Sequence, residues 1–70
     1  MTSAGIAPEA RMANDIARQF GHLDAGDAAA RIADHIGRFW DPRMRANLAH
    51  TLAHEPDSLD PLVRAAARSL

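Results

Sequence analysis

Apolar residues recur at helical spacing in four stretches of this 70-residue chain. In the first stretch, Met12, Ile16 and Phe20 follow one another at intervals of four residues, which places them on one face of a helix. Ala13, Ala17 and Leu23 lie beside them in the same stripe. Pro8 suits the first turn of that helix, because a missing N–H costs nothing there. The pattern therefore predicts a helix from Pro8 to about Gly21.

The second stretch follows a predicted turn over residues 23–27, where either Asp24 or Asp27 can act as the N-cap. Its apolar stripe predicts a helix that runs to about Trp40. The residues of this stripe are Ala29, Ile32, Ala33, Ile36 and Phe39. Trp40 lies about 100° round the helix from Phe39, so we expect it outside the stripe that faces the core.

The remaining two stretches begin with the same kind of dipeptide, Asp41-Pro42 and Asp60-Pro61. Asp is a preferred N-cap and Pro a preferred first helical residue, so each dipeptide predicts the start of a helix. The apolar stripes of these helices are Met44, Leu48 and Leu52, and then Leu62, Ala66 and Leu70 with Val63 and Ala67 adjacent. Because no stretch alternates as a strand does, the sequence predicts an all-α fold, a small bundle of three longer helices plus a short C-terminal helix.

The composition predicts a thin hydrophobic core. We expect a flexible N-terminal arm over residues 1–7, which has no periodic pattern, and a single helical domain over residues 8–70. A chain of this size buries only about 60% of its surface, and 16 of its apolar residues are alanines. Small scaffolds usually need a disulfide, a metal or a partner, and the absence of cysteine excludes the disulfide. Stabilisation by another protein chain is therefore expected.

The charge and hydropathy patterns limit the classes of partner. The net charge of −1 lacks the basic excess that is typical of nucleic-acid binders. No apolar run reaches the ~18 residues of a membrane span, and no basic stretch leads into an apolar one near the N-terminus. We therefore expect a cytoplasmic protein that binds neither nucleic acid nor membrane.

The strongest candidate for metal binding is a histidine pair. His50 and His54 are four residues apart and share one helix face, but Thr51 stands where a zinc protease motif has its glutamate. A stable zinc site needs three or four protein ligands, so an exposed pair without metal is the favoured interpretation. No Ser or Cys nucleophile with a visible base, and no glycine-rich phosphate loop, is present. The sequence thus predicts no catalytic, cofactor-binding or metal-binding residue.

Two further motifs suggest other small helical modules. The stretch Asp57-Ser58-Leu59 matches the phosphopantetheine attachment motif of acyl carrier proteins, but a loop with capping chemistry explains it better. Arginines at the head of the third helix suit a helix-turn-helix DNA-binding domain, although the Asp-Pro step is too tight for its turn. An independent binding module, carrier-like or DNA-binding, therefore stays as an alternative function.

A candidate protein-binding surface is predicted at the start of the third helix. Arg43 and Arg45 occupy its first turn, where cations oppose the positive end of the helix dipole. Trp and Arg are enriched at the energetic centres of interfaces, so Trp40, Arg43 and Arg45 are the predicted contact residues. Met44 is expected to be shared between core and partner. The alternative is that Trp40 caps the core and the arginines are solvated.

Several motifs in this chain resemble one known family. They are Arg11-Met12-Ala13-Asn14-Asp15-Ile16-Ala17, Ala33-Asp34-His35-Ile36, Phe39-Trp40-Asp41-Pro42-Arg43-Met44-Arg45 and Leu59-Asp60-Pro61-Leu62-Val63. Together they are similar to the delta subunit of soluble NAD-dependent molybdenum formate dehydrogenases, over about residues 10 to 67. Arg11 and Asn14, the polar positions of the first motif, form a second candidate contact patch.

The resemblance implies an accessory subunit that has no catalytic residue or cofactor of its own. In that family the alpha subunit carries the molybdenum (or tungsten) bis-guanine-dinucleotide cofactor and Fe–S clusters, and the beta and gamma subunits pass electrons through FMN to NAD. The alpha subunit is the expected contact, with beta and gamma in the same complex. The implied role is assembly, stability or cofactor acquisition, and a transient assembly chaperone is the alternative to a resident subunit.

Overall fold

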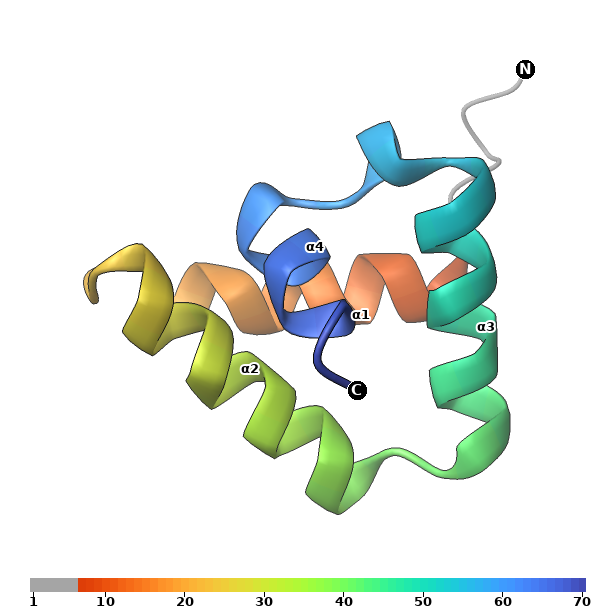
Figure 1. Cartoon of the computed structure of the whole chain (residues 1–70), viewed down its shortest axis with the longest axis horizontal. Coiled ribbons are helices and arrows are strands. Elements are labelled where there is room, and N and C mark those ends of the chain that lie inside the picture. Colours follow the sequence, from red (N-terminus) through yellow and green to blue (C-terminus); the bar gives the residue numbers. More distant parts are fainter. Residues whose placement is uncertain (1–6) are drawn as a thin grey trace.

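The computed structural model describes residues 7–70, which form four α-helices and one short 3-10 helix (Figure 1). The elements are α1 (Pro8–Gln19), α2 (Ala25–Phe39), α3 (Pro42–His54), η2 (Pro56–Ser58) and α4 (Pro61–Ala67). No strand is found among these residues, and the predicted all-α fold is confirmed. No helix within the described range is long and apolar enough to cross a bilayer.

The helix starts follow from local capping chemistry. Asp24, Asp41 and Asp60 are the N-caps of α2, α3 and α4, and each carboxylate accepts a hydrogen bond from a backbone N–H of the first turn. The donor–acceptor distance is 3.0 Å at Asp24 and 2.8 Å at the other two. Pro42 and Pro61 occupy the first helical position, as predicted. These caps satisfy N–H groups that would otherwise lack an intrahelical partner.

The N-cap of α3 gives a quantitative prediction. We expect Asp41→Ala to lower the free energy of unfolding by about 1 kcal/mol, because the Met44 N–H loses its acceptor. Chemical denaturation followed by circular dichroism measures the change. Asp57→Ala is the matched control, since Asp57 is an exposed carboxylate that does not cap an α-helix. Equal denaturation midpoints for the two variants would show that the cap contributes nothing.

The start of α1 differs from the others. Its N-cap is Ala7, which makes no side-chain capping bond and packs partly buried against the core. The other residues of the predicted N-terminal arm, residues 1–6, lie outside the described part of the chain. α1 ends at Gln19, slightly before the predicted end at Gly21.

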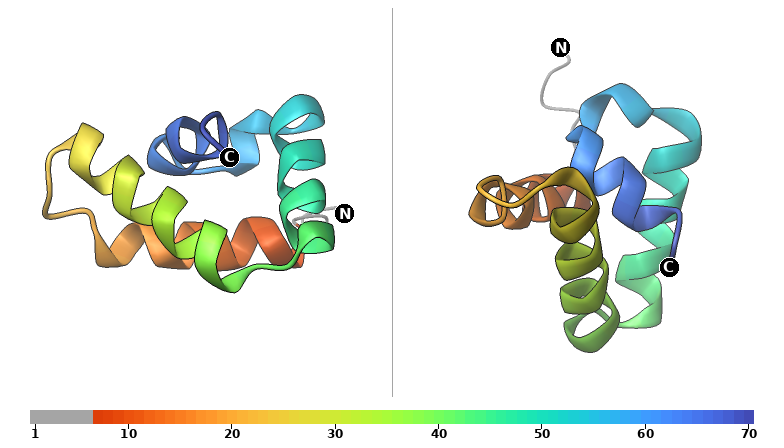
Figure 2. Two further views of the ribbon diagram at one scale, coloured as in Figure 1. Left: turned by 60° about the horizontal axis from the view of Figure 1, so that its bottom comes forward. Right: turned by 60° about the vertical axis from the view of Figure 1, so that its left-hand side comes forward.

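α4 lies between α2 and α3 and in front of α1 (Figures 1 and 2). Its most extensive contact is with α2, and it also packs against α1 and α3. α2 and α3 scarcely touch each other, although only Trp40 and Asp41 separate them in the chain. The short C-terminal helix therefore completes the core that the three longer helices surround.

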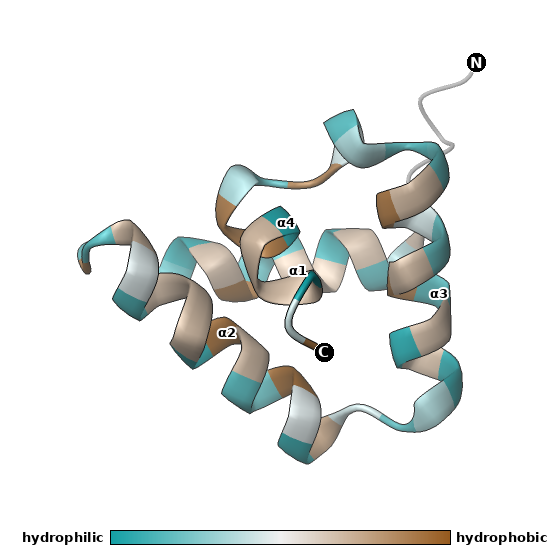
Figure 3. Cartoon of the chain, in the orientation of Figure 1, coloured by the Kyte–Doolittle hydropathy of each residue, from teal (hydrophilic) through white to brown (hydrophobic). Residues whose placement is uncertain are grey.

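The core is formed by a few large side chains and many alanines. Ile32, Ile36, Leu48 and Val63 are the largest fully buried side chains. On α2 the hydrophobic positions lie along the side that faces α4, and the outer side is hydrophilic (Figure 3). The buried alanines are Ala10, Ala13, Ala17, Ala28 and Ala66. Alanine takes little space, so backbones can approach closely where it faces a neighbouring helix.

The inward face of α1 is the alanine side of the predicted stripe. Ala13 and Ala17 are buried, whereas Met12 is 40% exposed and Ile16 and Phe20 are half-buried. The close approach of the other helices leaves room for alanine at the centre of the face and places the larger side chains at its edge.

The last helix shows a similar shift. Val63 and Ala66 are buried, Leu62 is half-buried and Leu70 is 48% exposed, so the predicted place of Leu70 in the core is wrong. α4 ends at Ala67, and helical spacing therefore does not extend to Leu70. This leaves an apolar side chain at the surface near α3.

Candidate protein-interaction surface

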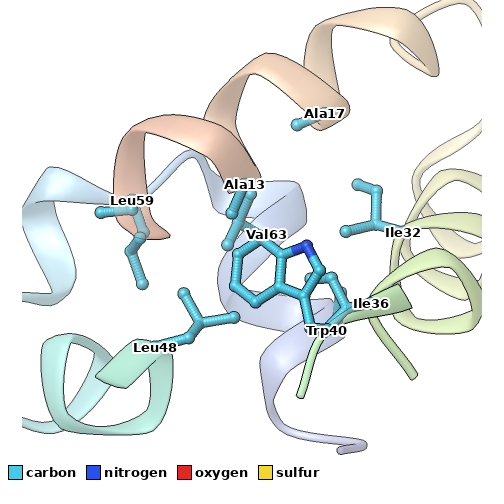
Figure 4. Close-up of a cluster of buried hydrophobic side chains, with 10 residues drawn as sticks. Ala13, Ala17, Ile32, Ile36, Trp40, Leu48, Leu59 and Val63 are labelled. Carbon is cyan, nitrogen blue, oxygen red and sulfur yellow. The ribbon is translucent and has the colours of Figure 1, made fainter. Parts of the chain in front are cut away.

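Trp40 lies in the core and not at the surface. Its side chain is 6% exposed and sits in the middle of the buried cluster, with Ala13, Ile36, Leu48 and Val63 around it (Figure 4). The residues come from α1, α2, α3 and α4, so the indole joins all four helices. This burial disagrees with the prediction that Trp40 is the centre of a partner contact. The alternative assigned Trp40 to the core, and the indole lies inside the core rather than at its edge.

The end of α2 explains why helical spacing misplaced two aromatic residues. α2 ends at Phe39, and Trp40 has extended backbone angles (φ −93°, ψ 137°), although its N–H still bonds to the Ile36 carbonyl at 3.0 Å. The chain therefore turns Trp40 inward and leaves Phe39 70% exposed, so the predicted core position of Phe39 is wrong. The spacing Ile32, Ile36, Trp40 is the signal in the sequence that points to this result.

Arg45 holds the link between α2 and α3. Its guanidinium Nη1 donates a hydrogen bond to the Trp40 carbonyl oxygen at 2.5 Å, and the side chain is half-buried. Met44 is also half-buried and packs against the core. Two of the predicted contact residues thus have roles inside the chain, with only part of each side chain at the surface.

Asn14 joins α1 to the segment that precedes α4. Its side-chain Nδ2 donates to the Ser58 carbonyl at 3.0 Å, and its Oδ1 accepts from the Asp60 N–H at 2.8 Å. Arg64 supports the same segment by donating to the Leu59 carbonyl at 2.9 Å. Asn14 therefore connects α1 to a segment that is distant in the sequence. It was predicted to contact a partner protein, but its side chain bonds within the chain.

The other predicted contact residues, Arg11 and Arg43, are exposed. Within residues 7–70 neither forms an ion pair. Arg43 is the second residue of α3 and Phe39 is the last residue of α2, so an exposed cation and an exposed aromatic ring occur close together in the chain. We call Arg38, Phe39 and Arg43 the junction surface. Arg38 is itself ion-paired with Asp34 at 3.2 Å, and both side chains are exposed.

A groove that no sequence pattern predicted lies between α3 and the end of α4. Its volume is about 300 Å³. Its lining residues are Pro42, Arg45, Ala46, Leu48, Ala49, Ala67 and Leu70. Six of the seven have apolar side chains, and Arg45 is the charged one. The groove begins at the first residue of α3 and therefore adjoins the junction surface.

The other candidate chemistry remains at the surface. His50 and His54 are both exposed, with ring centroids 4.3 Å apart. Within the described residues, no group of three or more His, Cys, Asp or Glu side chains is arranged to hold a metal ion. Ser58 closes the 3-10 helix η2, and its hydroxyl donates to the Glu55 carbonyl at 2.8 Å, which is local turn chemistry.

The fold and surface define a small all-α protein with an exposed aromatic–arginine junction and an adjoining apolar groove. Residues 10–67 match the family described as the NADH-dependent formate dehydrogenase delta subunit, FdsD, and the chain belongs to this family. The match covers nearly the whole chain, including every α-helix in all or most of its length. No curated protein and no solved structure matches the chain.

Proposed function

We propose that this chain is a non-catalytic accessory subunit of a cytoplasmic NAD-dependent molybdenum formate dehydrogenase complex, and that it docks on the catalytic alpha subunit through the junction surface. Membership of the delta subunit family supports the complex. The observation that carries the docking surface is Phe39, a large aromatic side chain that is 70% exposed beside an exposed arginine.

An exposed phenylalanine adds little to the stability of the free chain. Aromatic residues and arginine are enriched in the centres of protein interfaces, where they exclude water and fill pockets. The ring of Phe39 is also supported from one side, because the His35 ring lies 4.9 Å from it, centroid to centroid. This support limits the number of conformations that a partner must fix on binding.

Arg43 adds an argument from electrostatics. It lies in the first turn of α3, where the helix dipole disfavours a cation, and that turn contains no acidic residue. Its position therefore costs at most a few tenths of a kcal/mol in the free chain, because the N-cap carboxylate of Asp41 offsets part of the effect. An acidic group on the alpha subunit would offset this cost. Arg11, exposed on α1, is proposed as a second and smaller contact.

The role is one of support, through assembly, stability or cofactor acquisition of the alpha subunit. Fe–S clusters are held by cysteine thiolates, and this chain has no cysteine, so their ligands belong to other subunits. The molybdenum bis-guanine-dinucleotide cofactor, FMN and NAD are likewise proposed to reside on the alpha, beta and gamma subunits. The contribution of this chain is then the surface that it presents to them.

The docking proposal predicts a loss of affinity without a loss of folding. Phe39→Ala is expected to weaken association with the complex by about 1–2 kcal/mol, or roughly 5- to 30-fold in Kd. Titration of the purified chain into a complex that lacks it, followed by biolayer interferometry, measures the change. Arg31→Ala is the control, because Arg31 is an exposed residue of the same helix. Equal affinity of Phe39→Ala and wild type would remove Phe39 from the contact.

A second experiment separates a resident subunit from a transient chaperone. A tagged chain is purified from its host, and the subunit stoichiometry of the active enzyme is measured by native mass spectrometry. Stoichiometric presence in active enzyme supports the resident subunit. Presence only in enzyme that lacks molybdenum would support the chaperone, and recovery of the chain alone would contradict both roles.

A further inference from the structure

The groove between α3 and the end of α4 is suited to a protein side chain. Its volume of about 300 Å³ is at the lower limit for small-molecule sites. One side is formed by Ala46 and Ala49 of α3, and the other by Ala67 and Leu70. Leu70 is 48% exposed, so the groove has an apolar rim as well as an apolar floor. Such a surface accepts the apolar face of an amphipathic segment.

The charged side chains within α3 and within residues 61–70 are basic. α3 and residues 61–70 contain four arginines and two histidines but no aspartate or glutamate, although the whole chain has nine acidic residues. Arg45 lines the groove, and exposed Arg68 lies between two lining residues in the chain. Two carboxylates bond to α3: Asp41 caps it by accepting the Met44 N–H, and Glu9 accepts from the Asn47 side chain. The groove therefore has one basic residue in its lining and a second, Arg68, next to the lining residues in the chain, within a protein of net charge −1.

We infer that this groove binds an acidic amphipathic segment of the partner subunit. One apolar side chain of the segment inserts between α3 and Leu70, and its flanking carboxylates face Arg45 and Arg68. The charge complementarity of the walls argues for an acidic partner, and the size of the groove argues for a single apolar anchor. This inference rests on the proposed function and extends the contact from the junction surface along α3.

The first test fills the groove. Ala49→Trp places a large side chain against its wall, and Ala30→Trp places the same side chain on an exposed position of α2 as the matched control. Each variant is titrated into a formate dehydrogenase complex that lacks this chain. Wild type and Ala30→Trp are expected to bind alike, and Ala49→Trp at least about tenfold more weakly. Circular dichroism establishes that each variant is folded.

The second test reverses a charge without altering the core. Arg68→Glu changes an exposed side chain, and Arg31→Glu on α2 is the control. Arg68→Glu is expected to weaken binding several-fold at low salt, with a smaller effect at high salt, because exposed charges are screened. If Ala49→Trp fails to fold, the affinity of Arg68→Glu tests the groove inference by itself.

The outcomes separate this inference from the proposed function. If wild type binds the complex and both groove variants bind equally well, the groove inference is wrong and the proposed function stands. If wild type does not bind, the proposed function itself fails. Loss of binding for Ala49→Trp alone would overturn the acidic character of the segment. If wild type is a dimer and Ala49→Trp a monomer, the groove is an interface between copies of this chain, which also overturns the inference.

Discussion

Replacing Trp40 with alanine is expected to lower the free energy of unfolding by about 3–5 kcal/mol, because it removes the largest side chain of the core and leaves a cavity among all four helices. A domain of this size has a total stability of roughly 4–10 kcal/mol. The variant should therefore unfold at much lower denaturant concentration, and part of it should be unfolded in buffer. Chemical denaturation followed by circular dichroism measures this loss.

The neighbouring Phe39→Ala variant is the matched control. It removes an aromatic ring that is 70% exposed, so its stability should stay within about 0.5 kcal/mol of wild type. The two substitutions thus affect different properties: Trp40→Ala lowers the stability of the fold, and Phe39→Ala lowers the affinity for the complex. Trp40 is the single tryptophan of the chain, so its fluorescence in wild type follows the same unfolding transition. Equal stability of the two variants would contradict the burial of Trp40.

Replacing Asn14 with alanine is expected to cost about 2–4 kcal/mol, although the side chain is polar and only half-buried. The substitution leaves the Ser58 carbonyl and the Asp60 N–H without their partner, and each such group costs about 1–3 kcal/mol when shielded from water. Hydrogen exchange of the Asp60 amide should become markedly faster. Denaturation midpoints measure the global effect.

Asn47→Ala is the control for the Asn14 substitution. Asn47 also bonds across helices, from its Nδ2 to the Glu9 carboxylate at 3.2 Å, but this bond is exposed. Its loss should therefore change stability by less than about 1 kcal/mol. If Asn14→Ala and Asn47→Ala lower the free energy of unfolding by the same small amount, the hydrogen bonds of Asn14 do not hold the segment before α4 in place.

The sequence by itself determined the helical class and the starts of α3 and α4. The N-caps and prolines act on N–H groups of the same turn, so Asp41-Pro42 and Asp60-Pro61 predict helix starts without any knowledge of the tertiary fold. The absence of alternating apolar residues and the repeated four-residue spacing are enough for the all-α class. The family motifs depend only on the identity and order of the residues, so the sequence alone predicted the family. The family match over residues 10–67 confirms this prediction.

Only the tertiary structure decided which residues are available to a partner. Trp40 was expected at the surface and Phe39 in the core, and the opposite is found because the helix ends between them. Asn14 has hydrogen-bond partners more than 40 positions away in the chain, so no local sequence pattern predicts these bonds. The groove of α3 exists only because the end of α4 lies beside it. Helix formation depends on neighbours within one turn, whereas burial depends on residues that folding brings together from distant parts of the chain.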